Sequence, residues 1–147
     1  MIRPTKEQII SIYEMLIGKT GGSPGVINEP LLDSAINNIW QTFDGVELYP
    51  SLEEKGARLG YSLVSNHSFR DGNKRIGILA LQTFLSVNGI EVSCSDREIV
   101  ETGLALASGS MDYEALLDWI RKHSFAKHGD ILEEIFEMVR KMENPNE

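Results

Sequence analysis

Ten residues near the middle of the chain read Asn66-His67-Ser68-Phe69-Arg70-Asp71-Gly72-Asn73-Lys74-Arg75, and an apolar segment, residues 76–87, follows them directly. In that segment the large apolar side chains recur every three or four residues, which predicts an amphipathic helix. Asn73 lies where this helix should begin, and Asn88-Gly89 is suited to end it. The ten residues therefore form a loop that leads into a helix N-terminus, where unpaired amides and the helix dipole favour a bound anion.

The side chains of this loop fit an anionic ligand that carries a metal ion. Gly72 permits a close backbone approach, and Lys74 and Arg75 add two cations where the dipole alone would favour acids, which suits a bound phosphate. Asp71 offers a hard oxygen ligand of the kind that Mg²⁺ takes together with substrate phosphates. His67 carries an imidazole, which can accept a proton from a hydroxyl nucleophile. Together these residues supply what transfer of a phosphorus group from a nucleotide requires.

Each of these features has an ordinary structural explanation when it stands alone. A single histidine in a helical protein is usually structural or superficial, Asp71-Gly72-Asn73 would pass for a turn, and a Lys-Arg pair usually lies on a solvated helix face. Phe69, an apolar residue between polar ones, is expected to anchor the loop on the core. The functional interpretation rests on the occurrence of all these residues, in one order, within nine positions.

Helical periodicity continues on both sides of the loop, and the helix starts are well marked. A capping box, Ser or Thr followed three residues later by Glu or Gln, occurs at three of these starts: Thr5, Ser51 and Ser95. Turn-forming residues at 21–25 and 44–50 separate helical segments, and Ile90-Glu91-Val92 alternates as a short strand would. We therefore predict an all-α, single-domain bundle of about six or seven helices, with a short loop of some β character between the second and third.

Composition and charge narrow the classes of function. The chain has 147 residues, of which 41% are hydrophobic and 24% charged, as in an ordinary soluble globular domain. Its 14 basic and 22 acidic residues give a net charge of −8, which argues against nucleic-acid and anionic-membrane partners because both need a basic face. The single cysteine, Cys94, excludes an internal disulfide framework and a cysteine-based zinc site. The sequence shows no signal peptide and no apolar segment long enough to span a bilayer, so we expect a cytoplasmic protein.

The order His67-x-Phe69-x-Asp71-Gly72-Asn73-Lys74-Arg75 resembles the signature of the Fic/Doc superfamily, and in particular its Doc (death-on-curing) toxin branch. Further similarity to the Doc branch lies at four places along the chain: Gly21–Gly25, Leu31–Ala35, Tyr49-Pro50 and Phe84–Gly89. The resemblance implies a Fic/Doc-like catalytic domain over residues 1–128. Residues 129–147, which extend past such a domain, are expected to form an amphipathic helix and tail packed on the same domain.

Carried over position by position, the resemblance implies that His67 is the general base and Asp71 the Mg²⁺ ligand. Four residues would form the phosphate site for ATP, the first two by shaping it and the last two by contacting phosphates: Gly72, Asn73, Lys74 and Arg75. The resemblance also implies a protein substrate, such as translation elongation factor Tu. It further implies a partner antitoxin of the Phd kind, which folds across the nucleotide groove.

Two differences from Fic enzymes bear on the reaction. Fic enzymes transfer the AMP part of ATP to a target hydroxyl, and they carry Gly where this chain has Lys74 and a second Arg where it has Ile78. In Doc-like proteins this pattern accompanies ATP bound in the reverse direction and kinase activity, so a Doc-type protein kinase is the leading interpretation. AMP transfer and a catalytically inactive nucleotide- or antitoxin-binding module are the alternatives. A helix-turn-helix DNA binder would need a basic recognition helix, which the sequence lacks.

Two segments outside the motif carry further expectations. Residues 44–50 fall where the family has a flap that aligns the target peptide, with an ordinary interhelical loop as the alternative. The C-terminal apolar stripe, from Ile131 to Val139, is expected to pack on the core of its own chain. Packing of this stripe on a second copy, which would make a homodimer, is the alternative.

Overall fold

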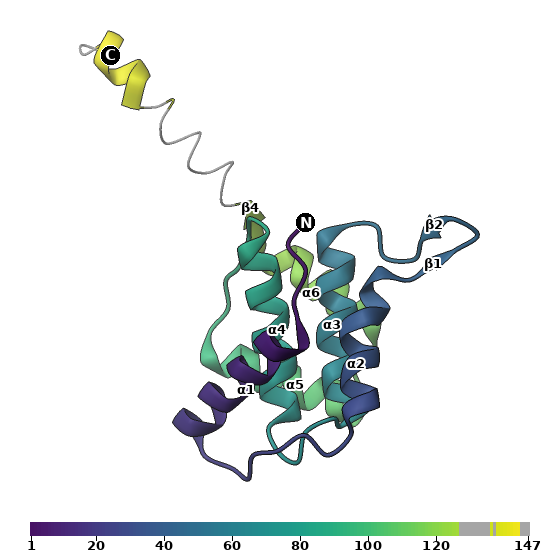
Figure 1. Cartoon of the computed structure of the whole chain (residues 1–147). Coiled ribbons are helices and arrows are strands. Elements are labelled where there is room, and N and C mark those ends of the chain that lie inside the picture. The colour runs from purple at the N-terminus through teal and green to yellow at the C-terminus, as the bar shows by residue number, and fades with distance from the viewer. Residues whose placement is uncertain (127–135, 137, 145–147) are drawn as a thin grey trace.

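Helices make up most of the chain in the computed structural model, which describes residues 1–126, 136 and 138–144 (Figure 1). In chain order the elements are α1 (Lys6–Thr20), α2 (Glu29–Asn37), the 3₁₀ helix η1 (Asn38–Trp40), β1 (Thr42–Phe43), β2 (Val46–Glu47), α3 (Leu52–Asn66), α4 (Asn73–Val87), β3 (Ile90–Val92), α5 (Asp96–Ser108), α6 (Tyr113–His123) and β4 (Ser124–Ala126). Residues 138–143 are helical as well. The predicted all-α class is confirmed, and the two antiparallel pairs, β1–β2 and β3–β4, are small additions to it. None of the helices described is long and apolar enough to cross a bilayer.

The helices begin close to where the capping signals predict. Thr5 and Ser95 form complete capping boxes at the starts of α1 and α5. Ser51 forms half of one, because its oxygen accepts from the Glu54 amide at 3.1 Å while the Glu54 carboxylate accepts from the Ser51 hydroxyl at 2.9 Å. Side-chain caps therefore fix the entry of these three helices, as local sequence can specify.

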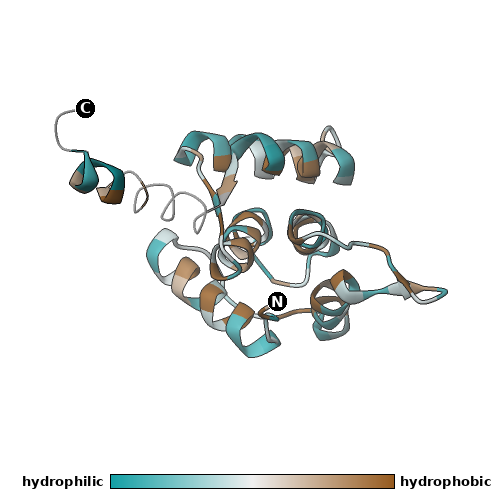
Figure 2. Ribbon diagram, turned by 90° about the horizontal axis from the view of Figure 1, so that it is seen from above, coloured by the Kyte–Doolittle hydropathy of each residue, from teal (hydrophilic) through white to brown (hydrophobic). Residues whose placement is uncertain are grey.

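Close backbone packing between α3 and α4 forms the centre of the bundle. A Cβ atom added to Gly77 of α4 would lie 2.9 Å from the Gly60 carbonyl oxygen of α3, and one added to Gly60 would lie 3.1 Å from the Gly77 carbonyl oxygen. Glycine at both positions therefore lets the two helices approach each other directly. The helices turn apolar sides inward and hydrophilic sides outward (Figure 2). This packing fixes the loop that joins α3 to α4.

The loop predicted between the second and third helices is a β-hairpin, in which Thr42 pairs with Glu47 and Phe43 with Val46. It precedes the N-terminus of α3, whereas His67 follows the C-terminus of that 15-residue helix. These two ends are about 22 Å apart along the helix axis. Figure 1 shows the hairpin at the upper right and the α3–α4 connection at the lower end. The hairpin therefore lies near the end of α3 opposite His67. Its role as a flap that aligns a target peptide and its role as an ordinary interhelical loop both stay predictions.

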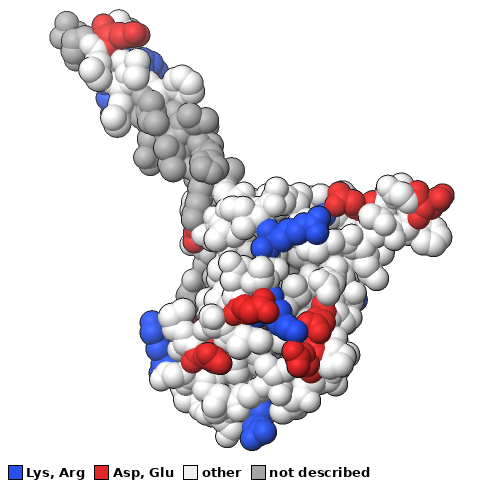
Figure 3. All heavy atoms as spheres, in the orientation of Figure 1, with Lys and Arg blue, Asp and Glu red and all other residues white. Residues whose placement is uncertain are grey.

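A buried lysine anchors the base of this hairpin. The Lys55 side chain, on α3, is 0% exposed, and its ammonium group donates to the Tyr49 carbonyl and pairs with the Glu47 carboxylate at 3.1 Å. The ammonium also lies 5.3 Å from the centre of the Trp40 ring. Beyond this anchor the hairpin exposes Phe43 and Val46, and Figure 3 shows acidic side chains at its end. The hairpin is thus tied to α3 at its base and surrounded by solvent at its tip.

The expected packing of the C-terminal stripe is untested. Ile131, Leu132 and Ile135 lie outside the described residues, as does the whole of segment 129–135. Phe136 and Val139, which the structure does describe, are exposed. Packing on the core and packing on a second copy therefore both stay predictions.

Candidate active site

The motif residues form the connection between α3 and α4, and two residues with left-handed backbone conformations mark its ends. His67 terminates α3 with φ 49° and ψ 50°, a conformation that is uncommon for residues other than glycine and that recurs at functional sites. Gly72 precedes α4 with φ 81°, and no side-chain hydrogen bond caps this helix. The amides of the first turn of α4 therefore have no side-chain cap, which leaves the anion site that the sequence predicts available.

Phe69 and Asn73 hold the middle of this connection. Phe69 is fully buried and stacks on Tyr13 of α1, with ring centres 3.9 Å apart, so its predicted role as a structural anchor is confirmed. The Asn73 side chain accepts from the Phe69 amide at 3.1 Å and donates to the Phe69 carbonyl at 2.9 Å. The Asn73 amide group thus fixes the shape of the loop, and its side chain is not left free to bind a ligand.

The turn-rich segment after α1, which sequence patterns identify only as a break, runs along the motif loop. The Arg70 amide donates to the Gly25 carbonyl at 2.9 Å. The amides of Ile27 and Asn28 both donate to the Ser68 carbonyl, at 2.9 and 3.1 Å. The only sequence signal for this contact was the family resemblance at Gly21–Gly25, because a pairing between segments so far apart in the chain leaves no local pattern.

A cavity of 430 Å³ lies over the start of α4. One side consists of seven residues of the motif: His67, Arg70, Asp71, Gly72, Asn73, Lys74 and Arg75. The other side is α5, which contributes Ile99, Val100, Gly103 and Leu104. A Cβ atom at Gly103 would lie 3.2 Å from Lys74 Cβ, so glycine lets α5 approach the start of α4. This apolar wall is not among the residues predicted from the sequence, although the exposed pair Val100 and Leu104, one turn apart, departs from an ordinary solvent-facing helix surface.

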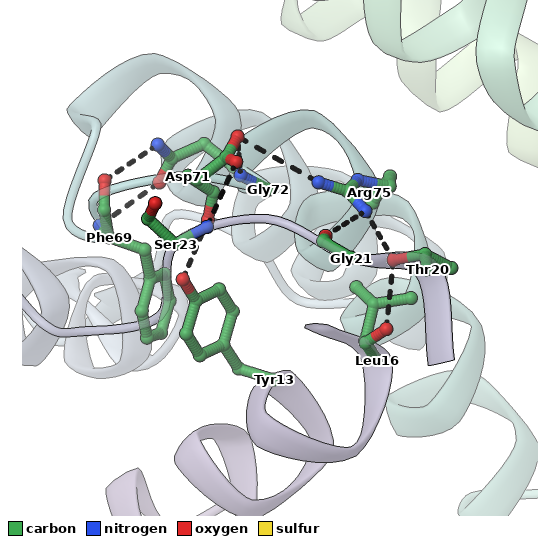
Figure 4. Close-up of polar contacts among 10 residues, drawn as sticks. Tyr13, Leu16, Thr20, Gly21, Ser23, Phe69, Asp71, Gly72 and Arg75 are labelled. Carbon is green, nitrogen blue, oxygen red and sulfur yellow. Dashed lines mark hydrogen bonds and ion pairs between the residues drawn. The ribbon is translucent and has the colours of Figure 1, made fainter. Parts of the chain in front are cut away.

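Asp71 and Arg75 meet at the edge of this cavity (Figure 4). The Asp71 side chain is 49% exposed; one carboxylate oxygen accepts from the Gly72 amide at 2.8 Å and the other from the Ser23 amide at 3.3 Å. The Arg75 guanidinium lies 3.8 Å from the first oxygen and also donates to the Thr20 hydroxyl and, at 3.1 Å, to the Gly21 carbonyl. Arg75 is therefore held beside Asp71 and the end of α1, and the exposed Lys74 is the freer of the two cations.

The donor set fits a metal ion that arrives with phosphates. Within the described ranges, no three His, Cys, Asp or Glu side chains gather into a metal-binding group. Mg²⁺ is commonly held by one or two carboxylates together with substrate phosphates, and Asp71 could supply one such carboxylate at the rim of the cavity. The fold thus brings all six residues expected at the site to one cavity: His67, Asp71, Gly72, Asn73, Lys74 and Arg75. Their chemical roles stay predictions.

Comparison with known proteins agrees with the motif. The model of the Fic/DOC family matches residues 3–85, which include α1 to α3, the whole motif and all but the last two residues of α4. The protein named Toxin Doc from Mycolicibacterium smegmatis is 42% identical over 73 residues, which are 50% of this chain and 56% of that protein's length. The protein named Protein kinase doc from Escherichia phage P1 is 26% identical over 116 residues, which are 79% of this chain and 90% of that protein.

Proposed function

The chain belongs to the Fic/DOC family, and from this membership we propose that it is a Doc-type toxin that transfers the γ-phosphate of ATP to a hydroxyl group of a protein. The observation that carries the proposal is the cavity in which His67, Asp71 and Lys74 surround the uncapped start of α4. The names of the two relatives, Toxin Doc and Protein kinase doc, support the toxin and kinase parts.

In such a transfer, each group of residues in the cavity would have a separate role. The first-turn amides of α4 and the Lys74 ammonium would bind phosphate oxygens, and the apolar wall of α5 would contact the nucleoside. Mg²⁺, held by Asp71, would neutralise phosphate charge when bound. His67 would accept the proton of the incoming hydroxyl as its oxygen bonds to the γ-phosphorus and the bond to the ADP oxygen breaks.

The identity of the protein target and of a binding partner belongs to the same proposal. Elongation factor Tu as the target and a Phd-kind antitoxin as the partner follow from the resemblance to the Doc branch. Such a target would place the protein in the cytoplasm. The negative net charge of −8 is compatible with both partners, since neither is a nucleic acid.

Ile78 favours phosphate transfer over AMP transfer. Fic enzymes carry a second Arg at this position, and here the residue is Ile78, which is fully buried in the core and does not line the cavity. The position therefore presents no cation to a triphosphate. Because a guanidinium binds phosphate oxygens strongly, its loss changes where a triphosphate can settle.

The direct test of the proposed chemistry is the His67→Ala variant. We expect transfer of label from γ-labelled ATP to elongation factor Tu to fall about 10²- to 10⁴-fold, because the general base is lost. Nucleotide binding should persist, since the phosphate site remains. His123→Ala is the control, because this histidine is bonded to Glu98 and does not line the cavity. Undiminished transfer by His67→Ala would refute the catalytic assignment and favour an inactive binding module.

A further inference from the structure

Tyr13 of α1 contacts the motif at two points. Its ring stacks on Phe69, and its hydroxyl donates to the Asp71 main-chain carbonyl at 2.8 Å (Figure 4). The residue is only 1% exposed, so its hydroxyl is withdrawn from bulk water and needs an internal acceptor. The Asp71 carbonyl is the acceptor that the structure gives it. Tyr13 therefore fixes the backbone of the residue whose side chain faces the cavity.

The turn after α1 constrains the side chain of Asp71. The Ser23 amide donates to one Asp71 carboxylate oxygen at 3.3 Å. A Cβ atom at Gly22 would lie 2.5 Å from that oxygen, so the carboxylate rests directly against the Gly22 backbone. Arg75 adds a further link between this turn and Asp71, because its guanidinium donates to the Thr20 hydroxyl and the Gly21 carbonyl and lies 3.8 Å from the Asp71 carboxylate.

We propose that Tyr13 is a positioning residue, which together with the Gly22-Ser23 turn orients Asp71 toward the metal ion of a bound metal–nucleotide complex. The inference rests on the proposed function. It assigns a role in the site to a residue of α1, which lies outside the motif. A single carboxylate ligand is effective only if it is held within about 0.5 Å of its productive position. Asp71 lies in the loop between α3 and α4 and not in a regular element, so this precision has to come from contacts made by another part of the chain.

The test compares Tyr13→Phe with Tyr113→Phe in the full chain. Tyr13→Phe keeps the ring that stacks on Phe69 and removes only the hydroxyl. Tyr113→Phe makes the same chemical change at a hydroxyl that donates to the Glu54 carbonyl at 3.4 Å, near the opposite end of α3. Mn²⁺, titrated by electron paramagnetic resonance in the presence of excess ADP, reports metal binding without any transfer reaction.

We expect Tyr13→Phe to raise the half-saturating Mn²⁺ concentration about tenfold, as loss of an outer-shell partner commonly does. Tyr113→Phe should bind Mn²⁺ as the wild type does. A second pair, Gly22→Ala and Gly25→Ala, repeats the test with Tyr13 intact. Both glycines have positive φ, but a Cβ at Gly25 meets nothing within 4 Å, so only Gly22→Ala should weaken binding.

The outcomes separate this inference from the proposed function. Wild-type Mn²⁺ binding by Tyr13→Phe and Gly22→Ala would overturn the inference, whether or not the protein transfers phosphate. Weakened binding by these two variants alone would support it, even if no transfer to a protein were found and the proposed function failed. A wild-type chain that binds no Mn²⁺ with ADP would overturn both.

Discussion

At the scale of single residues, Glu98 links two helices through one carboxylate. One oxygen accepts from the Ser95 amide at 3.1 Å and completes the capping box of α5. The other lies 2.7 Å from Nε2 of His123, at the end of α6. The Ser95 amide and then His123 lower the pKa of Glu98 below its ordinary value of 4.5. The charged form is therefore the one that the fold stabilises.

This lowered pKa predicts how stability should vary with pH. The contribution of Glu98 is fully present above pH 4.5 and is lost as the pH falls through the lower pKa of the folded state. Glu98→Gln keeps an oxygen that can accept from Ser95 but removes the charge. Its deficit in Tm relative to the wild type should be largest at neutral pH and shrink below pH 4.5. Thermal unfolding from pH 7 to pH 3 measures it, with the exposed Glu101→Gln as control. A deficit that stayed constant across this range would contradict the prediction.

Among single residues, sequence reasoning succeeded where the relevant chemistry is local. The Thr5 and Ser95 caps, the glycine conformation at Gly72 and the apolar anchor Phe69 each depend on near neighbours in the chain. Tyr13 could not be found in this way. Its apolar spacing identifies it as a core residue, and its bond to Asp71 joins positions 58 apart.

At the scale of elements, the β1–β2 hairpin and the motif loop lie at opposite ends of α3. The hairpin is fixed at the N-terminal end of α3 by Lys55, and the motif begins at the other end of the same helix. A change at Lys55 should therefore loosen the hairpin without disturbing the cavity.

Lys55→Met tests this separation. The variant leaves the Tyr49 carbonyl and the Glu47 carboxylate without their buried donor, which should lower the free energy of unfolding by about 1.5–3 kcal/mol. Amide hydrogen exchange should accelerate in residues 42–50, while nucleotide binding at the motif stays as in the wild type. Lys6→Met, which removes more exposed ion pairs with Glu29 and Asp33, should lower the free energy of unfolding less than Lys55→Met does. Unchanged exchange in the hairpin would show that Lys55 does not anchor it.

The elements were predicted more completely than their arrangement. Periodicity and caps indicated the helices, and a short strand at Ile90–Val92 was anticipated. The partner of that strand, β4, was not, because a three-residue strand that follows α6 directly has no pattern of its own. Gly60 and Gly77 likewise carry no periodic signal, although they set the closest approach of the two central helices.

At the scale of the whole molecule, the cavity is assembled from parts that lie far apart in the sequence. The segment that matches the family model, residues 3–85, contains the motif loop and α1. The apolar wall of the cavity comes from α5, beyond that match. The charged residues that line the cavity are contiguous, so the sequence alone can predict that they lie together. The apolar residues depend on how α5 packs on α4, which leaves no local pattern. A net charge of −8 gave no sign of this local arrangement.

The central claim is that this cavity holds ATP so that the γ-phosphate, and not the α-phosphate, is transferred. Parallel reactions with α-labelled and γ-labelled ATP, Mg²⁺ and purified elongation factor Tu test it most directly, with His67→Ala beside the wild type in each. We expect that label from the γ-position reaches the protein target, that label from the α-position does not, and that His67→Ala reduces the transfer about 10²- to 10⁴-fold. Label from the α-position on the target would contradict the account and identify an AMP transferase.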